Sequence, residues 1–446
     1  MSALKLLLTM NLPYYPAHGG ANKANRFLAE GFAEHGHEVT VVAPALGVPS
    51  QITIAELLES LPDQGISVER TADSIIFEMA GVTVHAVTEP TRIRAYLVER
   101  LKSDRPDWAI VSSEEPTQNL LNAAVESYPG RIIYLAHTPT FLPFGPQSFY
   151  PSGRRTALLE KVNGIIAVSQ FMDDYIRKHS RLESKMLYLP VYGAGPFPVL
   201  GRYANSYVTM VNPCRLKGID IFKRLATAMP DIAFAAVPTW GTTPSDLAEL
   251  EHIPNVHILA PSNDIDRIFE QTRILLMPSL WLECFGLTAV EAQLRGVPVI
   301  ASDVGGLPEA MFDTGFLIPV TPIESFSNEL DENTIPTAPP PEIDLEPWRA
   351  ALTTLLSDEE TYDHHAINAR DHALRFHASV NIGSWERYLI DLPEGNCCVT
   401  TIKEPVPVEP KPDALSTLTP EQRALLLQRL KKKDRTTPHL QHRRSR

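Results

Sequence analysis

The chain has 446 residues, 44% of them hydrophobic, and a formal net charge of −13 at pH 7. That length allows two or three domains with cores of their own, and the acidic balance argues against a general nucleic-acid-binding protein. No apolar run approaches the roughly 20 residues of a membrane span, and four cysteines without disulfide or metal spacing indicate reduced thiols, so we expect a cytoplasmic protein.

In the first part of the chain, short apolar strands alternate with helical patterns. The predicted elements are a strand at Leu4–Met10, a helix at Ala21–His35, and strands at Glu38–Ala43, Trp108–Val111, Ile132–Ala136 and Ile165–Val168. Strands separated by helices predict βαβ units and a parallel sheet. The segment Gly47–Glu89 is harder to interpret, because its short Val/Ile runs fit either a small extra sheet or a hairpin.

A Pro- and Gly-rich break at Leu189–Gly201 indicates a linker between two domains. The later predicted strands are Tyr207–Val211, Ile232–Ala236, Val256–Leu259, Ile274–Met277 and Val297–Ala301. A Pro-rich loop at Thr321–Pro347 then precedes a helix predicted from Trp348 to about Phe376. The pattern predicts an α/β protein in which two doubly wound domains, residues 1–193 and 194–378, face each other across a cleft.

The stretch from Met277 to Glu309 carries the most specific pattern in the chain. Glu283 follows an apolar strand, and Glu291 lies eight residues later, in the expected first turn of the next helix. Open α/β sheets bind ligands at the carboxyl ends of their strands, so both carboxylates can face one crevice beside a helix N-terminus that suits a phosphate. A Gly-Val-Pro-Val-Ile strand and a second loop, Gly305–Glu309, complete the block.

This block resembles the donor-sugar signature of the retaining glycosyltransferases of family four, which have the GT-B fold of two Rossmann-like domains. The resemblance implies that Glu291 binds the ribose of a nucleotide-diphosphate sugar and that Glu283 contacts hydroxyls of the transferred sugar. The backbone N–H groups implied to hold the sugar and the phosphate are those of Phe285, Gly286, Leu287 and Thr288. Family members also carry a last helix back onto the first domain, which we expect at residues 379–392.

Two other loops resemble phosphate-contacting turns of this family. Gly19 and Gly20 separate the first strand from its helix, where backbone N–H groups can approach an anion, and the resemblance implies contact with the donor diphosphate and the acceptor. In the second domain, Lys217-Gly218 resembles a turn whose lysine binds the diphosphate and stabilises its growing charge. Many relatives place an arginine five or six residues earlier; here the nearby arginine is Arg215, for which a plain surface role is an alternative.

His137 follows a predicted strand, at a position where the family often has a polar or acidic residue facing the sugar and the acceptor. We expect His137 to orient sugar hydroxyls or to share the acceptor proton, with a polar filler at the strand end as the alternative. Glu114 and Glu115 follow the preceding strand, toward the mouth of the same cleft. Ser169 is predicted to cap the next helix.

The resemblance implies transfer of a hexosyl group to an acceptor hydroxyl with retention, by attack on the same face as the leaving diphosphate. Retaining hydrolases need a carboxylate nucleophile, whereas Glu283 and Glu291 are expected to bind hydroxyls. We expect no cofactor and no metal. The Asp-x-Asp sequence Asp264-Ile265-Asp266 could in principle bind a metal, but it falls where relatives place the loop beside the nucleotide base. The acceptor is a small molecule such as a secondary metabolite, or a glycan precursor. Alternatives are an inactive GT-B scaffold and a GT-B phosphorylase or epimerase.

The C-terminal segment, residues 393–446, differs in charge from the rest of the chain. From Glu421 to Arg446 there are nine Lys/Arg and two Asp/Glu, a net +7 that leaves −20 elsewhere. The stretch Leu415–Lys431 has a helix-start pattern and resembles the short helices that join domains in nonribosomal peptide synthetases and polyketide synthases. We expect a flexible tail whose residues 413–433 dock on such a natural-product assembly line. A peripheral membrane surface and a disordered segment are the alternatives.

Overall fold

The computed structural model describes residues 3–17, 19–47, 52–339, 341–393 and 395. All of these residues lie within the unit Met1–Pro405, to which the fold below belongs. The docking or membrane helix expected within residues 413–433 lies outside the described residues and stays a prediction. Among the described residues, no helix combines the length and the apolar character needed to cross a membrane.

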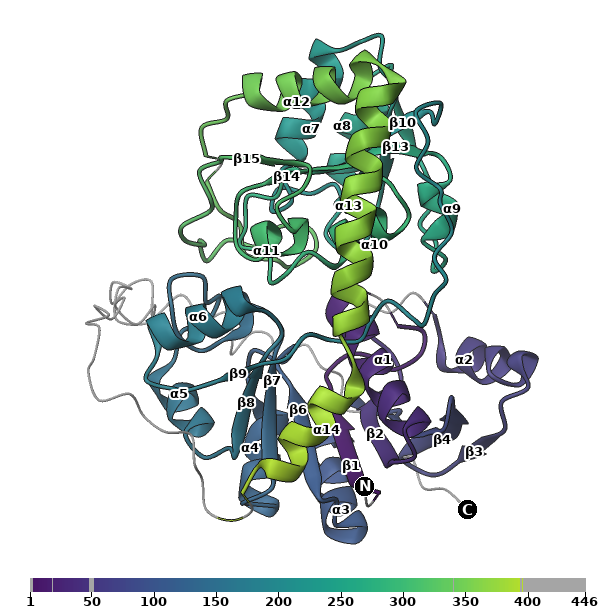
Figure 1. The fold of residues 1–446 in the computed structure, drawn as a ribbon. Coiled ribbons are helices and arrows are strands. Elements are labelled where there is room, and N and C mark those ends of the chain that lie inside the picture. Colours follow the sequence, from purple (N-terminus) through teal and green to yellow (C-terminus); the bar gives the residue numbers. More distant parts are fainter. Residues whose placement is uncertain (1–2, 18, 48–51, 340, 394, 396–446) are drawn as a thin grey trace, which may run out of the picture. The chain divides into compact units, whose positions relative to one another are not determined.

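Nine strands form the first sheet, in the order β3-β4-β5-β2-β1-β6-β7-β8-β9 (Figure 1). Their bounds are β1 Lys5–Thr9, β2 Glu38–Pro44, β3 Val68–Arg70, β4 Ser74–Met79, β5 Val82–Val87, β6 Trp108–Ser112, β7 Ile132–Ala136, β8 Gly164–Ala167 and β9 Lys185–Met186. All pairs are parallel except those that β4 makes with β3 and β5. The segment Gly47–Glu89 therefore contains a hairpin, which extends the main sheet because β5 pairs with β2.

Helices connect the parallel strands of this sheet. They are α1 Gly20–Glu34, α2 Ile54–Ser60, α3 Ile93–Asp104, α4 Asn119–Ser127, α5 Gly153–Leu159 and α6 Gln170–His179, with short 3₁₀ turns η1 Pro62–Gln64, η2 Pro90–Arg92 and η3 Pro139–Phe141. Every residue of β6 and β7 is buried, as expected for central parallel strands that are covered on both faces. Ser169 caps α6 as predicted, because its hydroxyl accepts a hydrogen bond from the Met172 N–H.

The second sheet has six parallel strands, in the order β12-β11-β10-β13-β14-β15. Its strands are β10 Tyr207–Val211, β11 Phe234–Val237, β12 Val256–Ile258, β13 Thr272–Met277, β14 Val299–Ser302 and β15 Phe316–Ile318, and its helices are α7 Ile219–Ala228, α8 Pro244–Glu251, α9 Asp266–Phe269, α10 Leu287–Leu294 and α11 Leu307–Met311. The chain passes from the first sheet to the second between Met186 and Tyr207, a stretch without helix or strand that contains the predicted linker.

The helix expected from Trp348 to Phe376 is two helices, α12 Glu346–Ser357 and α13 Glu359–Ser379 (Figure 1). Asp358 separates them in an extended conformation, and its carboxylate caps α13 by accepting a 2.8 Å hydrogen bond from the Thr361 N–H. An N-cap of this type ends one helix and starts the next, so a single continuous helix was the wrong expectation.

The last described helix, α14 Ile382–Asp391, packs into the core of the first sheet. The indole N–H of Trp385 donates to the Tyr188 carbonyl at 2.9 Å, and that of Trp108 donates to the Leu389 carbonyl at 2.9 Å. These bonds satisfy the polar atoms of two fully covered tryptophans, which lets both bury their large apolar surface.

Candidate functional site

Lys217 and Glu283 meet where the neighbouring strands β10 and β13 end. The Lys217 ammonium pairs with the Glu283 carboxylate, and the Ser279 hydroxyl donates to the same carboxylate oxygen. Lys217 Nζ also lies 4.8 Å from the centre of the Trp281 ring, within cation–π range. The Lys217 and Glu283 side chains keep only 18% and 9% of their exposure. Water therefore screens the pair weakly, and an incoming ligand has two fixed charges to engage.

Glycine lets the turns that carry these charges approach each other. Gly218 has φ +80°, and a Cβ there would lie 1.9 Å from the Pro278 carbonyl oxygen. The backbone N–H groups of Leu280 and Trp281 both donate to the Leu216 carbonyl, at 2.9 and 3.1 Å. The turn after β10 and the turn after β13 are thus one bonded unit, which fixes the distance between the lysine and the glutamate.

The Gly305-Gly306 loop after β14 packs against the backbone of Glu283. A Cβ on Gly305 would lie 2.3 Å from the Glu283 carbonyl oxygen, and one on Gly306 would lie 2.6 Å from the Cys284 carbonyl oxygen. The Gly306 N–H donates to the Glu283 carbonyl at 2.7 Å. The Gly305-Gly306 loop therefore fixes the backbone of the loop that carries Glu283.

Helix α10 begins beside this pair with an open N-terminus. Its N-cap is Gly286, at φ +118°, which provides no side-chain cap, and its first turn holds no acidic residue. The Phe285 side chain is a core residue, packed 5.4 Å from the Tyr188 ring. Such a helix start offers backbone N–H groups and a positive dipole end to an anion.

Glu291 lies one turn deeper in α10 than expected, because the helix starts at Leu287 and places Glu291 in the second turn. Burial raises the pKa of the Glu291 carboxyl, while the positive charges of Lys23 and Arg295 oppose the shift. Lys23 comes from α1, so a residue of the first sheet's helical layer is close enough to influence a residue of α10.

The Gly19-Gly20 loop lies against the loops of the second sheet. A Cβ on Gly20 would meet the Leu287 side chain at 3.5 Å, and one on Gly19, at φ +83°, would meet the Trp240 side chain at 3.9 Å. Gly19 is the N-cap of α1 and contributes no side-chain cap. The loop expected to contact the diphosphate is therefore next to the start of α10.

His137 belongs to a buried polar cluster at the carboxyl ends of β6 and β7. The Asn25 amide donates to Glu114 Oε1 at 2.5 Å and to the Ser112 hydroxyl at 2.9 Å. Its carbonyl oxygen lies 2.8 Å from His137 Nε2, and Glu114 Oε1 lies 3.8 Å from the same nitrogen. All four side chains belong to residues that are at most 6% exposed. A cluster this buried is favourable only when its polar groups are paired.

The hydrogen bonds of the cluster select one tautomer of His137. Asn25 uses its NH₂ group for Ser112 and Glu114, so its oxygen accepts, and His137 Nε2 carries the proton. Burial lowers the pKa of His137, although the nearby Glu114 opposes this effect. The ring is therefore neutral near pH 7, with Nδ1 as its acceptor. Glu115 has a different role, because its carboxylate caps α4 by accepting from the N–H groups of Asn119 and Leu120.

Arg215 and Asn212 share the turn that carries Lys217. Arg215 is exposed and is not paired with Glu283. Asn212, five residues before Lys217, is 4% exposed, and its side-chain oxygen accepts from the Gly241 N–H at 2.9 Å. Asn212 thus stands in the stretch where relatives often carry an arginine, and it ties the β10 turn to the loop after β11.

Two family models match this chain. Residues 18–190 match Glycosyltransferase Family 4, and residues 238–333 match Glycosyl transferases group 1. Sucrose-phosphate synthase from Thermosynechococcus elongatus superposes with a TM-score of 0.61 at 17% identity, over 86% of this chain and 98% of that one. Anabaena Alr3699/HepE, solved with UDP and glucose, gives 0.59 at 18% identity, over 87% and 98%. The fold is GT-B.

Curated relatives of this GT-B chain match over shorter stretches. A D-inositol 3-phosphate glycosyltransferase from Mycobacterium sp. (strain KMS) is 34% identical over 140 residues, which are 28% of this chain and 31% of that protein. The chain spans between 21% and 38% of the length of the curated relatives first matched. Together the comparisons support a glycosyltransferase of the family-four, GT-B type.

Glu309, which was expected in the second loop but lies in the first turn of α11, links the two GT-B halves. Its carboxylate accepts from the N–H groups of Gln170 and Phe171, at 3.0 and 3.2 Å, in the first turn of α6. The Tyr188 hydroxyl donates to the same carboxylate, and the Ser169 hydroxyl donates to the Cys284 carbonyl. The start of α6 is therefore held against the loop that carries Glu283.

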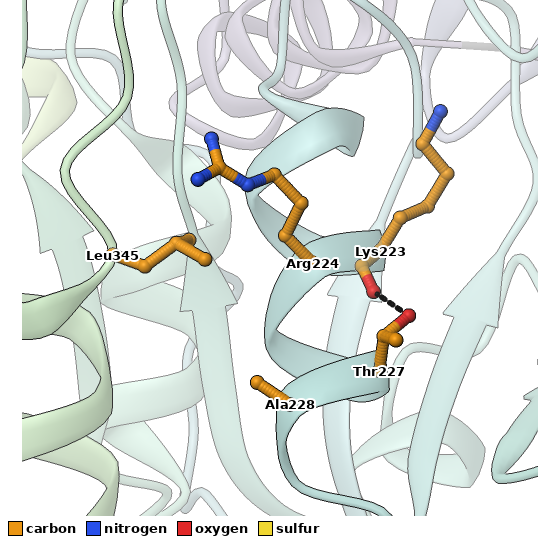
Figure 2. Close-up of a pocket in the computed structure, with 5 residues that line it drawn as sticks. All are labelled: Lys223, Arg224, Thr227, Ala228 and Leu345. Atoms are coloured by element: carbon orange, nitrogen blue, oxygen red, sulfur yellow. Dashed lines mark hydrogen bonds between the residues drawn. The ribbon is translucent and has the colours of Figure 1, made fainter.

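A separate cavity of about 300 Å³ lies along α7 (Figure 2). It is lined by Lys223, Arg224, Thr227, Ala228 and Leu345. Figure 2 shows the Thr227 hydroxyl bonded to the Lys223 carbonyl, a contact within the helix itself. None of the residues expected to bind the donor lines this cavity, so it forms no part of the candidate site.

The sequence did not single out Asn25, Trp240 or Trp281. Asn25 looks like an ordinary polar residue inside α1, and its role depends on side chains 89 and 112 residues away. Trp240 had a readable signal, since a tryptophan three residues after an apolar strand, beside glycine and threonine, is unusual for a plain turn. Trp281 lies two residues before Glu283, within the Met277–Glu309 block, where the glutamates and glycines carried the interpretation.

Proposed function

We propose that the protein transfers a hexosyl group from a nucleotide-diphosphate sugar to an acceptor hydroxyl, with retention at the anomeric carbon and without a metal or other cofactor. The observation that carries this proposal is the Lys217–Glu283 pair beside the open N-terminus of α10, opposite Gly19-Gly20. The Anabaena structure was solved with UDP and glucose, which makes UDP-glucose the first donor to test.

Donor binding separates the charges that are paired in this structure. Lys217 turns to the diphosphate, which also receives N–H groups from the start of α10, and Glu283 is then free to accept hydrogen bonds from the sugar hydroxyls. Glu291, deeper in the same helix, accepts from the ribose hydroxyls. An ion pair that exchanges partners in this way keeps both charges compensated before and after the donor binds.

In the reaction, the bond between the anomeric carbon and the diphosphate oxygen breaks, and the acceptor oxygen forms its bond on the same face. The acceptor proton passes to the departing diphosphate oxygen. Lys217 and the dipole of α10 stabilise the negative charge that develops there. His137 presents a neutral ring whose Nδ1 accepts a hydrogen bond from a sugar or acceptor hydroxyl and orients it.

The charge balance of the site supports metal-independent chemistry. Asp266 is paired with Arg295, and Asp264 lies 3.5 Å from Arg267, so both carboxylates of the Asp-x-Asp sequence already have cationic partners. Lys217 and the helix start supply positive charge where the diphosphate leaves. Release of UDP from UDP-glucose should accordingly persist in EDTA.

The test combines binding and turnover. Melting temperatures are measured with UDP, GDP and ADP, and release of the nucleotide is then followed with the matching hexose donors, with and without acceptor. Glu283→Ala should abolish release, whereas Glu251→Ala, a change at an exposed glutamate of the second half, should not. Full activity in Glu283→Ala would contradict the proposal. Nucleotide binding without any release would favour the inactive scaffold.

A further inference from the structure

Trp240 is an exposed tryptophan beside the candidate site. Its residue surface is 47% exposed, whereas Trp108, Trp348 and Trp385 are at most 3% exposed, and Trp281 is half-buried. The chain has five tryptophans, so Trp240 is the one most open to solvent. An indole left open beside charged groups can be covered by the apolar face of an amphipathic ligand.

The loop that presents Trp240 is held by several hydrogen bonds. Next to it, the Gly241 N–H donates to the Asn212 side chain at 2.9 Å, and the Thr242 N–H donates to the Thr239 carbonyl at 3.1 Å. The Asn333 side chain donates to the Trp240 and Thr242 carbonyls, at 3.4 and 3.2 Å. The exposure of Trp240 is therefore built into an anchored turn, which gives the indole a defined position.

Trp240 continues a row of side chains that ends at Glu283. Its ring lies 6.0 Å from the Trp281 ring at an angle of 47°, and Trp281 in turn lies under the Lys217 ammonium. Lys217 pairs with Glu283. An apolar surface and two polar groups thus stand side by side. This combination suits a sugar, whose ring presents a face of C–H groups to an aromatic plane and directs hydroxyls to its edge.

We propose that Trp240 is the stacking surface for a pyranose or cyclitol ring of the acceptor. This inference rests on the proposed function and extends it to the class of acceptor. The position of Trp240 indicates that the stacked ring belongs to the acceptor rather than to the donor. Gly20 faces Leu287 at the start of α10, where the diphosphate is expected, whereas Gly19 faces Trp240 on the other side of the loop. A ring on Trp240 places its hydroxyls within the region of Lys217 and Glu283.

The test uses tryptophan fluorescence, because acrylamide reaches an exposed indole and barely reaches buried ones. The full chain is titrated with acrylamide alone, with saturating UDP, and with UDP plus methyl α-glucopyranoside, N-acetylglucosamine, myo-inositol or glucose 6-phosphate. We expect at least one ring compound to protect the accessible emission when UDP alone does not. Trp240→Phe should remove that emission while keeping part of the ring affinity.

Ligand-observed NMR with the protecting compound then measures the stacking. Trp240→Leu should weaken its binding by about fivefold to tenfold, the range of an aromatic contact, while Tyr150→Leu, at another exposed aromatic residue, should not. A melting shift with UDP in Trp240→Leu shows that the variant is folded and binds nucleotide. Protection by UDP alone, protection by no ring compound, or unchanged affinity in Trp240→Leu each overturn the acceptor assignment. Absence of any melting shift with UDP, GDP and ADP in the wild type overturns the proposed function itself.

Discussion

The two halves of the candidate site are built in opposite ways. The cluster of Asn25, Ser112, Glu114 and His137 in the first half is fixed by neutral and charge-assisted hydrogen bonds that are made within the protein. In the second half, Lys217 and Glu283 hold each other as a single ion pair beside an uncapped helix. The first arrangement fixes Asn25 and His137 before a ligand arrives, although Glu114 Oε2 is buried without a hydrogen-bond partner. The second is a pair of charges that a ligand can separate.

This difference separates positioning from charge stabilisation. A buried hydrogen-bond network keeps a polar side chain in one orientation and one protonation state. In the proposed function, the diphosphate and a sugar hydroxyl replace the partners of this partly buried ion pair. Substitutions in the first half should therefore change stability along with rate, and those in the second half should change rate most.

The largest effect is expected at Lys217. Lys217→Met keeps the length of the side chain but removes the charge that stabilises the leaving diphosphate, so nucleotide release should fall by about 10²–10³-fold. Melting temperature without ligand should also fall, because the substitution leaves the poorly exposed Glu283 carboxylate without its cation. Lys223→Met removes another ion-paired lysine, in α7, and is the matched control. A large loss of stability with unchanged turnover per folded molecule would contradict the assignment of charge stabilisation to the second half of the site.

Asn25 provides the converse test. Asn25→Ala leaves Glu114 and His137 buried without their shared partner, so the free energy of unfolding should fall by about 1–3 kcal/mol. Glu114→Gln is milder, because a neutral amide keeps an oxygen to accept from Asn25. Denaturant unfolding of both variants checks the order, and a tolerated Asn25→Ala would show that the network is dispensable.

Glu291 should give the site a pH dependence. Burial raises the pKa of its carboxyl, and the ribose needs the ionised form, so UDP affinity should decline on the acid side at a higher pH than an ordinary glutamate would allow. Isothermal titration of UDP across pH 4.5–8 measures this. Glu291→Gln should bind about tenfold more weakly at neutral pH and lose that acid-side decline; retention of the decline assigns it to another group.

The smallest effect is expected from removing the tail. Every residue assigned to the two halves lies before Pro393, so a chain ending at Pro412 should keep the UDP melting shift and nucleotide release of the full protein. The predicted docking of residues 413–433 concerns delivery of the acceptor. It is tested by comparing product formation by both chains with a peptide-synthetase substrate complex and with anionic vesicles.

Sequence patterns located the elements that are set by local rules. Continuous apolar runs predicted β6 and β7, and the motif predicted that Glu283 precedes α10 and that Glu291 lies within it. The break at Asp358 was missed, although Asp followed by two glutamates is a recognisable helix start. The Asn25–Glu114–His137 network was not readable, since it depends on which strands become neighbours of β1. The position of Trp240 beside the candidate site was likewise not predictable, because it depends on packing near Gly19, which is distant in sequence.

The close fit of Gly305 and Gly306 against the backbone of Glu283 and Cys284 has a consequence for engineering. The two loops have no room between them for even a methyl group. They therefore have to be exchanged together, although 18 residues, among them α10 and β14, separate Phe285 from Val304. Replacing loop 278–286 alone with that of another transferase should misplace Glu283. Replacing loop 303–306 at the same time should keep Glu283 in position, because the new loop then packs against its native partner.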